Sequence, residues 1–306
     1  ASVQLDAITL TNLTLGAGTQ AQLDSEWQPL SISPRLAVGP NETYAVAGTP
    51  GNSVSFVNGK ATFSNLGLKI TPGDSVELVI VGGASSAARD GDVLDLGIAA
   101  ASDIQFSSPL TVGGTWPLSP SGAFAVDGMS AAQIQVQDVG GAQYLSGSRR
   151  NLAFSAILPA NGYDADVLQK LNVSNEGSAV AGSDITLMEL WRDADGNGRF
   201  DPGTDVLVGP MPFTGDRWEI TGLSLPVPVA GLQMYVSCDL SETAAEGRTL
   251  RLALPGPPDL AIGMQSNNDG PIDGTVDGPS IQTVSTADRI VLTAQPVLPG
   301  ITHAGA

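Results

Sequence analysis

The chain repeats itself after about 156 residues. The stretch FVNGKATFSNLGLKI from Phe56 aligns with FTGDRWEITGLSLPV from Phe213, 157 residues further on. One residue is then lost, and the stretch that starts at Val76 aligns with the stretch that starts at Leu232, 156 residues further on. Solenoid repeats have periods of about 20–50 residues, so a period of this length indicates two copies of a whole domain.

Within each copy the apolar residues recur at every second position. Short runs such as VELVIV and TLRLAL are bounded by turn residues, and the chain contains 37 glycines and 21 prolines. Alternation in short runs between turns is typical of antiparallel strands, and no convincing amphipathic helix pattern interrupts it. The sequence therefore predicts an all-β protein of two tandem antiparallel β-sandwich (Ig-like) domains.

The predicted domain boundary lies in a Gly/Ser/Arg-rich stretch around residues 140–150. It assigns residues 1–143 to the first β-sandwich, and residues 144–306 to the second sandwich with its acidic loop and C-terminal tail. If the two halves share one fold, matched positions such as Phe63 and Ile220 are expected to be buried alike.

Acidic residues outnumber basic ones by 31 to 13, which gives a formal net charge of −18. Such a chain is repelled by polyanions, so nucleic acid and anionic membrane surfaces are not expected as partners. No apolar run reaches the roughly 18 residues that a membrane span needs. One cysteine, Cys238, on the apolar face of a strand, and one histidine, His303, make a nucleophilic catalytic unit unexpected, which favours a protein that is not an enzyme.

The stretch WRDADGNGRFDPGTDVLVG has the ligand spacing of a calcium loop. With Asp193 at position 1, Asp195 falls at position 3, Asn197 at 5 and Asp201 at 9. Gly198 at position 6 permits the sharp turn of an EF-hand loop. Calcium prefers such oxygen ligands and tolerates irregular geometry.

The loop departs from an EF-hand in two ways. Position 12 is Thr204 instead of the bidentate glutamate, with Asp205 one residue further on, and the flanking segments are strand-like instead of helical. Arg199 at position 7 is expected to offer its backbone carbonyl. The predicted Ca²⁺ ligands are therefore Asp193, Asp195, Asn197, Arg199, Asp201 and Asp205. The alternative is a solvated acidic hairpin that binds nothing in particular.

A strand-like stretch that ends in Asn175-Glu176-Gly177 leads to an alternating strand at 185–191 and then to the acidic loop. In this order the pieces resemble bacterial cell-adhesion-related (CARDB-like) and other Ig-like surface repeats. The resemblance covers roughly the second half of the chain, and the first half only through the internal repeat. It implies a secreted, multidomain protein at the bacterial cell surface.

Two other features leave alternatives open. Asp269, Asp273 and Asp277 lie at intervals of four among glycines, which fits either a second calcium site or a flexible loop. The four tryptophans can anchor the cores or form a surface on which sugars stack. They are Trp27, Trp116, Trp191 and Trp218.

These features favour a structural subunit of an extracellular bacterial surface assembly, such as a filament, fibre, stalk or surface layer, that calcium stabilises. The alternative is an adhesin or a carbohydrate-binding accessory module, with cell-surface glycans or other surface proteins as partners. A hydrolase would need carboxylates clustered in a cleft.

The chain ends suggest self-association. The stretch NLAFSAILPA at 151–160 precedes the second copy, whereas the first copy opens at VQLDAITLTN with only Ala1 and Ser2 ahead of it. The first sandwich is therefore expected to lack an edge strand. The tail PVLPGITHAGA at 296–306 follows the second copy as NLAFSAILPA follows the first, so it is predicted to pair with the open edge of another copy. The alternative is a frayed tail that pairs with nothing.

Overall fold

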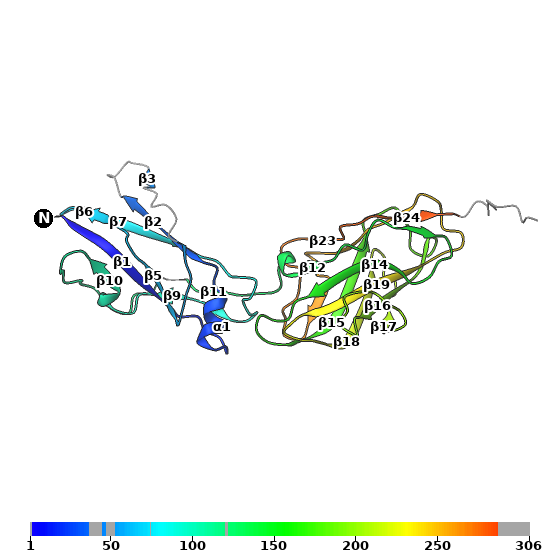
Figure 1. The fold of residues 1–306 in the computed structure, drawn as a ribbon, viewed down its shortest axis with the longest axis horizontal. Coiled ribbons are helices and arrows are strands. Elements are labelled where there is room, and N and C mark those ends of the chain that lie inside the picture. The colour runs from blue at the N-terminus through cyan, green and yellow to red at the C-terminus, as the bar shows by residue number, and fades with distance from the viewer. Residues whose placement is uncertain (1, 37–44, 47–52, 74, 120–121, 287–306) are drawn as a thin grey trace, which may run out of the picture.

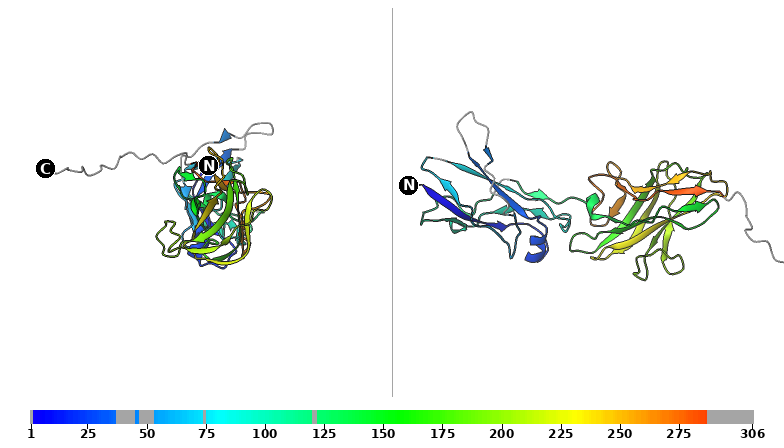
Figure 2. Two further views of the ribbon diagram at one scale, coloured as in Figure 1. Left: turned by 90° about the vertical axis from the view of Figure 1, so that its right-hand side faces the viewer. Right: turned by 45° about the horizontal axis from the view of Figure 1, so that its top comes forward.

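The structure is a computed structural model that describes residues 2–36, 45–46, 53–73, 75–119 and 122–286. Figure 1 shows two lobes placed end to end along the longest axis, and the right view of Figure 2 shows the same arrangement after a turn about that axis. Nearly all of the regular structure is β-strand in antiparallel pairs, which confirms the all-β prediction. In the described residues no helix has both the length and the apolar character needed to cross a bilayer.

The first lobe has two main sheets. One contains β1 (Val3–Asn12) paired with β5 (Lys60–Phe63), β6 (Leu68–Ile70), β9 (Leu96–Gly97) and β10 (Ile104–Phe106). The other contains β2 (Leu30–Leu36) paired with β3 (Ala45–Val46), β4 (Ser53–Val54) and β7 (Val76–Val81). The remaining elements are α1 (Gln20–Ser25), a 3-10 turn at Ala101–Asp103 and the pair β8 (Val93–Leu94) and β11 (Phe124–Ala125).

The second lobe repeats this plan with longer strands. One sheet has the order β12 (Gln135–Val136), β14 (Asn151–Leu158), β19 (Leu232–Leu240), β16 (Ile185–Arg192) and β17 (Val206–Pro210). The other contains β15 (Asp166–Asn175), β18 (Trp218–Val227), β21 (Leu252–Leu254), β22 (Ile262–Met264) and β23 (Val276–Asp277). A small sheet joins β13 (Gln143–Leu145) in parallel to β24 (Gln282–Ser285), which also pairs with β20 (Thr249–Leu250), and a 3-10 turn covers Ala131–Gln133.

Each lobe encloses its own cluster of buried apolar side chains. The first cluster is centred on β1 and β2, and the second on β14, β15, β16 and β19. The second cluster also contains Met129 and Ile134, which come before the boundary predicted at residues 143 and 144. That boundary stays a prediction, but the contacts of these two side chains belong to the second lobe.

The strand register supports the internal repeat. Ile8 of β1 pairs with Phe63 of β5, and Leu171 of β15 pairs with Ile220 of β18, so Phe63 and Ile220 occupy equivalent places. Their burial is not alike, however. Phe63 is fully buried, whereas Ile220 only packs against its cluster from a partly exposed position. Equivalent register therefore does not guarantee equivalent burial.

Both central strands carry a bulge at the same place. The register of β1 shifts between Leu5 and Ala7, and that of β15 shifts between Leu168 and Lys170. An extra residue in one strand reverses the side on which the following side chains lie. Leu5 and Ile8 can therefore both face the core although they are three residues apart. This explains why the apolar alternation breaks near the start of each copy.

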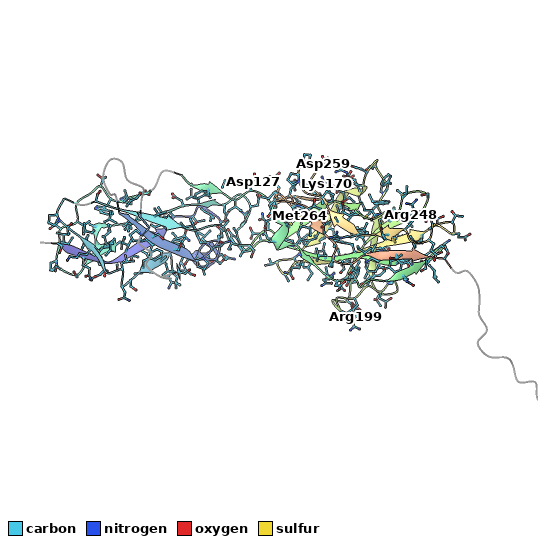
Figure 3. The ribbon with its side chains drawn as sticks, turned by 90° about the horizontal axis from the view of Figure 1, so that it is seen from above. Asp127, Lys170, Arg199, Arg248, Asp259 and Met264 are labelled. Atoms are coloured by element: carbon cyan, nitrogen blue, oxygen red, sulfur yellow. The ribbon has the colours of Figure 1, made fainter. Side chains whose placement is uncertain are left out.

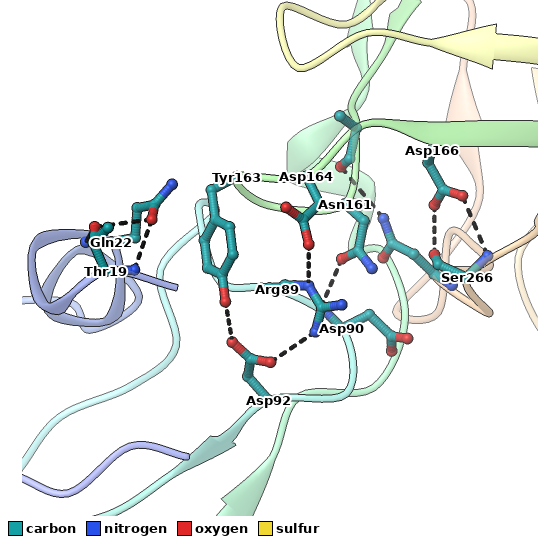
Figure 4. Close-up of polar contacts among 12 residues, drawn as sticks. Thr19, Gln22, Arg89, Asp90, Asp92, Asn161, Tyr163, Asp164, Asp166 and Ser266 are labelled. Atoms are coloured by element: carbon teal, nitrogen blue, oxygen red, sulfur yellow. Dashed lines mark hydrogen bonds and ion pairs between the residues drawn. The ribbon is translucent and has the colours of Figure 1, made fainter. Parts of the chain in front are cut away.

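The hairpin ARDGD at 88–92 contacts the second lobe through polar groups (Figure 4). Arg89 Nε donates to Asp164 Oδ2 at 2.7 Å, and Arg89 Nη1 donates to Asp92 Oδ1 at 2.8 Å. The Tyr163 hydroxyl donates to Asp92 Oδ2 at 2.7 Å. A continuous set of charge-assisted hydrogen bonds thus connects the two lobes.

Glu26 lies next to Asp92 and Arg89 of this junction and is fully buried. Neither of its carboxyl oxygens has a hydrogen-bond partner among the described residues. Burial, and then the neighbouring Asp92 carboxylate, raise the pKa of Glu26 to about 8, against the lowering effect of Arg89. The folded protein therefore holds a proton on Glu26 at pH values where the unfolded chain has released it.

We predict that Glu26→Gln flattens the pH dependence of stability. Because the pKa is higher in the folded state, the parent loses stability as the pH rises from about 4.5 to about 8. Glutamine stays neutral, so the variant should exceed the parent by about 2–4 kcal/mol at the upper end. Chemical unfolding across this range measures the effect, with the exposed Glu242→Gln as the control. A parent whose stability does not fall relative to the variant would contradict the prediction.

Candidate metal centre

The acidic loop connects β16 to β17 and lies on the outer face of their sheet. The ring of Phe200, which belongs to the loop, is 5.5 Å from the ring of Trp191 and 5.5 Å from the ring of Tyr235, measured between centroids. Both of these sheet residues are buried. Phe200 therefore attaches the polar loop to the sheet by an apolar contact.

Three of the predicted ligands converge. Carboxylate oxygens of Asp193, Asp195 and Asp205 all lie within 4.8 Å of one another. Asp205 is buried, Asp193 is partly buried and Asp195 is exposed. The cluster thus lies at the base of the loop, where one side of it faces the protein.

Backbone N–H groups orient Asp193. Its Oδ1 accepts from the N–H of Gly196 and its Oδ2 from that of Gly198, each at 2.8 Å. Burial alone would raise the pKa of Asp193, but the hydrogen bonds from Gly198 and Gly196 outweigh it and lower the pKa. The carboxylate is therefore held in its charged form, as a metal ligand must be.

The two glycines are required by the backbone. Gly196 has φ of +73° and Gly198 has φ of +69°, which is the left-handed region that side chains disfavour. The sharp turn predicted at Gly198 is present, and a second one precedes it. Both N–H groups can point at Asp193 only because the chain turns in this way.

Asp205 closes the other end of the loop. Its Oδ2 accepts from the N–H of Asp201 at 2.7 Å and its Oδ1 from that of Ala194 at 3.3 Å. Asp201 instead directs Oδ1 to the N–H of Gly203 at 2.8 Å and does not belong to the converging group. One carboxylate thus holds both ends of the loop together.

The other two predicted ligands lie at the tip. Asn197 donates from Nδ2 to Asp195 Oδ2 at 2.8 Å, and its Oδ1 accepts from the N–H of Arg199 at 2.6 Å. The Arg199 side chain is exposed and points away from the lobe (Figure 3). Coordination by the Asn197 amide and by the Arg199 carbonyl stays a prediction.

No arginine or lysine in the described part of the chain forms an ion pair with Asp193, Asp195 or Asp205. At about 4.8 Å each pair of carboxylates repels by about 1 kcal/mol in bulk water and by about 3 kcal/mol at an effective dielectric constant of 20. A cation among the three oxygens would remove this repulsion. The donors are all oxygens, which suits a hard cation such as Ca²⁺.

Tyr235 is a further residue at this site, and the spacing of the aspartates did not predict it. It is 1% exposed, and its hydroxyl has no hydrogen-bond partner among the described residues. Burial, and then the carboxylates of Asp193 and Asp205, raise its pKa. A buried hydroxyl beside an acidic cluster is a group that a bound ion and its water can satisfy. The sequence signal for Tyr235 is its place on the polar side of an otherwise apolar strand.

The second acidic stretch does not form a comparable cluster. Asp269 Oδ1 accepts from the N–H of Met264 at 2.7 Å, and Asp273 Oδ1 accepts from that of Ala131 at 2.6 Å. Asp277 forms an ion pair with Arg251 at 2.9 Å. Each carboxylate therefore has its own structural partner.

Other predicted features fall as follows. Cys238 is buried on the apolar face of β19, where burial raises the pKa of its thiol to about 12. Trp27, Trp191 and Trp218 are buried, and Trp116 is partly exposed. His303 and the C-terminal tail lie outside the described residues.

Sequence comparison provides no relative from which a function could be transferred. No protein-family model matches the chain, and no curated protein matches it in sequence. The chemistry of the acidic loop is therefore argued from its own atoms.

We predict that Asp193→Ala combined with Asp195→Ala removes one calcium site. These substitutions delete two of the three converging carboxylates. Calorimetric titration of the parent should show a single tight site that is absent from the double variant. The matched control is Asp216→Ala with Asp259→Ala, which removes two exposed carboxylates that pair with Arg217 in the same lobe. Unchanged calcium binding in the first variant would show that the assignment is wrong.

Proposed function

We propose that the protein is a non-enzymatic structural subunit of an extracellular bacterial surface assembly, such as a filament, fibre, stalk or surface layer. In this proposal calcium binds the acidic loop of the second lobe and stabilises it. The ion acts as a staple between the loop and the sheet and takes no part in a reaction.

The observation that carries this proposal is the position of the three carboxylates. They lie at the base of a loop that Phe200 attaches to the outer face of the sheet. An ion held there joins the two ends of the loop to the lobe and adds rigidity. The junction between the lobes supports the same reading, because charge-assisted hydrogen bonds keep the two lobes in line.

The tryptophans do not favour the adhesin alternative. A sugar-stacking surface needs exposed aromatic faces, whereas Trp27, Trp191 and Trp218 are buried. The indole Nε1 of Trp191 also donates to Ser237 Oγ at 2.9 Å, so neither its buried ring nor its N–H is available to a sugar. We therefore propose the structural role alone.

Immunogold labelling of source cells in negative stain tests the location and the role together. Label that follows filaments, fibres, stalks or a layer outside the cell agrees with the proposal. Label confined to the cytoplasm, or spread singly through the medium, contradicts it.

We predict that calcium raises the free energy of unfolding and that a chelator reverses the effect. Stabilisation follows mass action, about 2.7 kcal/mol at a free concentration one hundred times the dissociation constant. Thermal or urea unfolding with and without calcium measures it. Magnesium at equal concentration should stabilise less, because it demands a tighter octahedral shell. The variant that lacks the Asp193 and Asp195 carboxylates should show no calcium response, and an equal response there contradicts the proposal.

A further inference from the structure

In the second lobe, β14 covers the edge of β19. It pairs with β19 along its length, and Phe154, Ala156 and Leu158 reach the core between the two sheets. The inward-facing residues of β19 are consequently buried as well. They are Leu232, Met234, Val236, Cys238 and Leu240. One strand thus closes the sandwich on this side.

In the first lobe, β7 stands where β19 stands in the second. Val76–Val81 aligns with 232–237 at the offset of 156 residues, and each strand pairs with the equivalent neighbour, β2 or β16. No strand among the described residues pairs with the other edge of β7. Its backbone N–H and C=O groups on that edge are open to another strand.

An apolar groove of about 440 Å³ lies along this open edge, between the two sheets. Its walls are built by β1, β7, β9 and β10, together with Ile98, Leu118 and Ser119 from the loops. The lining includes Leu5, Ile8, Leu78, Ile80, Ile104 and Phe106. The groove therefore combines apolar walls with unpaired backbone groups.

The two lobes differ in the burial of equivalent residues. Leu78 and Ile80 are partly exposed, whereas Met234 and Val236 are each 0% exposed. Phe106, which pairs with Leu5, is partly exposed as well. The groove in the first lobe thus lies where β14 lies in the second.

The chain contains a second segment that resembles β14. RIVLTAQPVLP at 289–299 aligns with RNLAFSAILP at 150–159, with one inserted residue. If the segment is a strand, every second residue counted back from the shared Leu-Pro lies on the same side of it, and these residues are all apolar. They are Ile290, Leu292, Ala294, Pro296 and Leu298. Proline is compatible with a strand at a sheet edge, where its nitrogen needs no partner.

This segment cannot reach the groove of its own chain. The last described strand, β24, ends at the far side of the second lobe from the first lobe (Figure 1). Arg289 follows Thr286 by three residues, which span about 10 Å when extended. The second lobe separates Thr286 from the groove, and the eight residues of β14 alone extend over about 27 Å of that lobe.

We propose that residues 289–299 of one copy add a strand to the open edge of β7 in another copy, and fill the apolar groove beside it. The contact joins the segment that follows the second lobe of one molecule to the first lobe of the next, so it is heterologous and builds an open-ended row. This inference names the partner within the proposed structural role and rests on it.

Charged substitutions in the 306-residue chain test which face of the segment enters the groove. Leu292→Asp with Leu298→Asp places two carboxylates on the apolar side, and Thr293→Asp with Gln295→Asp places two on the opposite side. Light scattering over a concentration series should show masses that are multiples of 31.1 kDa for the parent and the control, and a monomer for the first variant. Assembly that persists in the first variant, or a parent that is monomeric throughout, overturns the inference.

Disulfide trapping tests the pairing itself. Ile157 pairs with Gln233 in the second lobe. In the alignments Ile157 corresponds to Val297 and Gln233 to Glu77, so Val297 of one copy is expected to pair with Glu77 of another. Oxidising a mixture of the single variants Glu77→Cys and Val297→Cys should give a dimer of unlike chains, because the native Cys238 is buried. A mixture of Val297→Cys with Asp216→Cys, at an exposed position, should not give this dimer. Equal dimer yields in the two mixtures overturn the inference.

The inference and the proposed function fail separately. The segment variants leave the acidic loop unchanged, so calcium binding serves as a check of their folding. A monomeric parent that calcium still stabilises, and that immunogold still places on a surface structure, overturns strand donation alone. Label confined to the inside of the cell overturns the structural role, whether or not the chains assemble in solution.

Discussion

The structure depends on one requirement of β-sandwiches: a strand with a buried apolar face also needs partners for its backbone groups. In the second lobe β14 meets this requirement for β19, and the residues on the inner face of both strands are buried. In the first lobe β7 pairs on one edge only, as far as the described residues go, and its inner face lines a groove. The same sheet plan thus gives one closed lobe and one lobe open along an edge.

The outer face of the second lobe is subject to a related constraint. β19 carries Tyr235 and Ser237 on the side that a sandwich usually turns to solvent, and both are buried. Phe200 packs against both Trp191 and Tyr235, which brings the acidic loop onto the sheet. Burial of aromatic surface therefore holds three carboxylates closer together than their mutual repulsion favours, and a cation bound among them would relieve that repulsion.

The sequence was most informative where the determinants are local. Alternation and turn residues predicted an all-β chain, and the offsets of 157 and 156 residues agree with the strand registers of the two lobes. The spacing of Asp193, Asp195 and Asp205 was enough to place their carboxylates together, because thirteen residues of one loop contain all three. It did not separate Asp201, whose side chain turns to the backbone of Gly203.

The sequence by itself determined the strand periods, the repeat and the acidic loop, since each depends on residues that are neighbours in the chain. Only the tertiary structure decided which strand edges are covered, that Tyr235 lies beside the aspartates, and that the turn at Arg89 joins the lobes. These contacts connect residues far apart in the chain. The physical reason is that alternation specifies which side of a strand is apolar, whereas the neighbours of that strand depend on how the sheets are assembled.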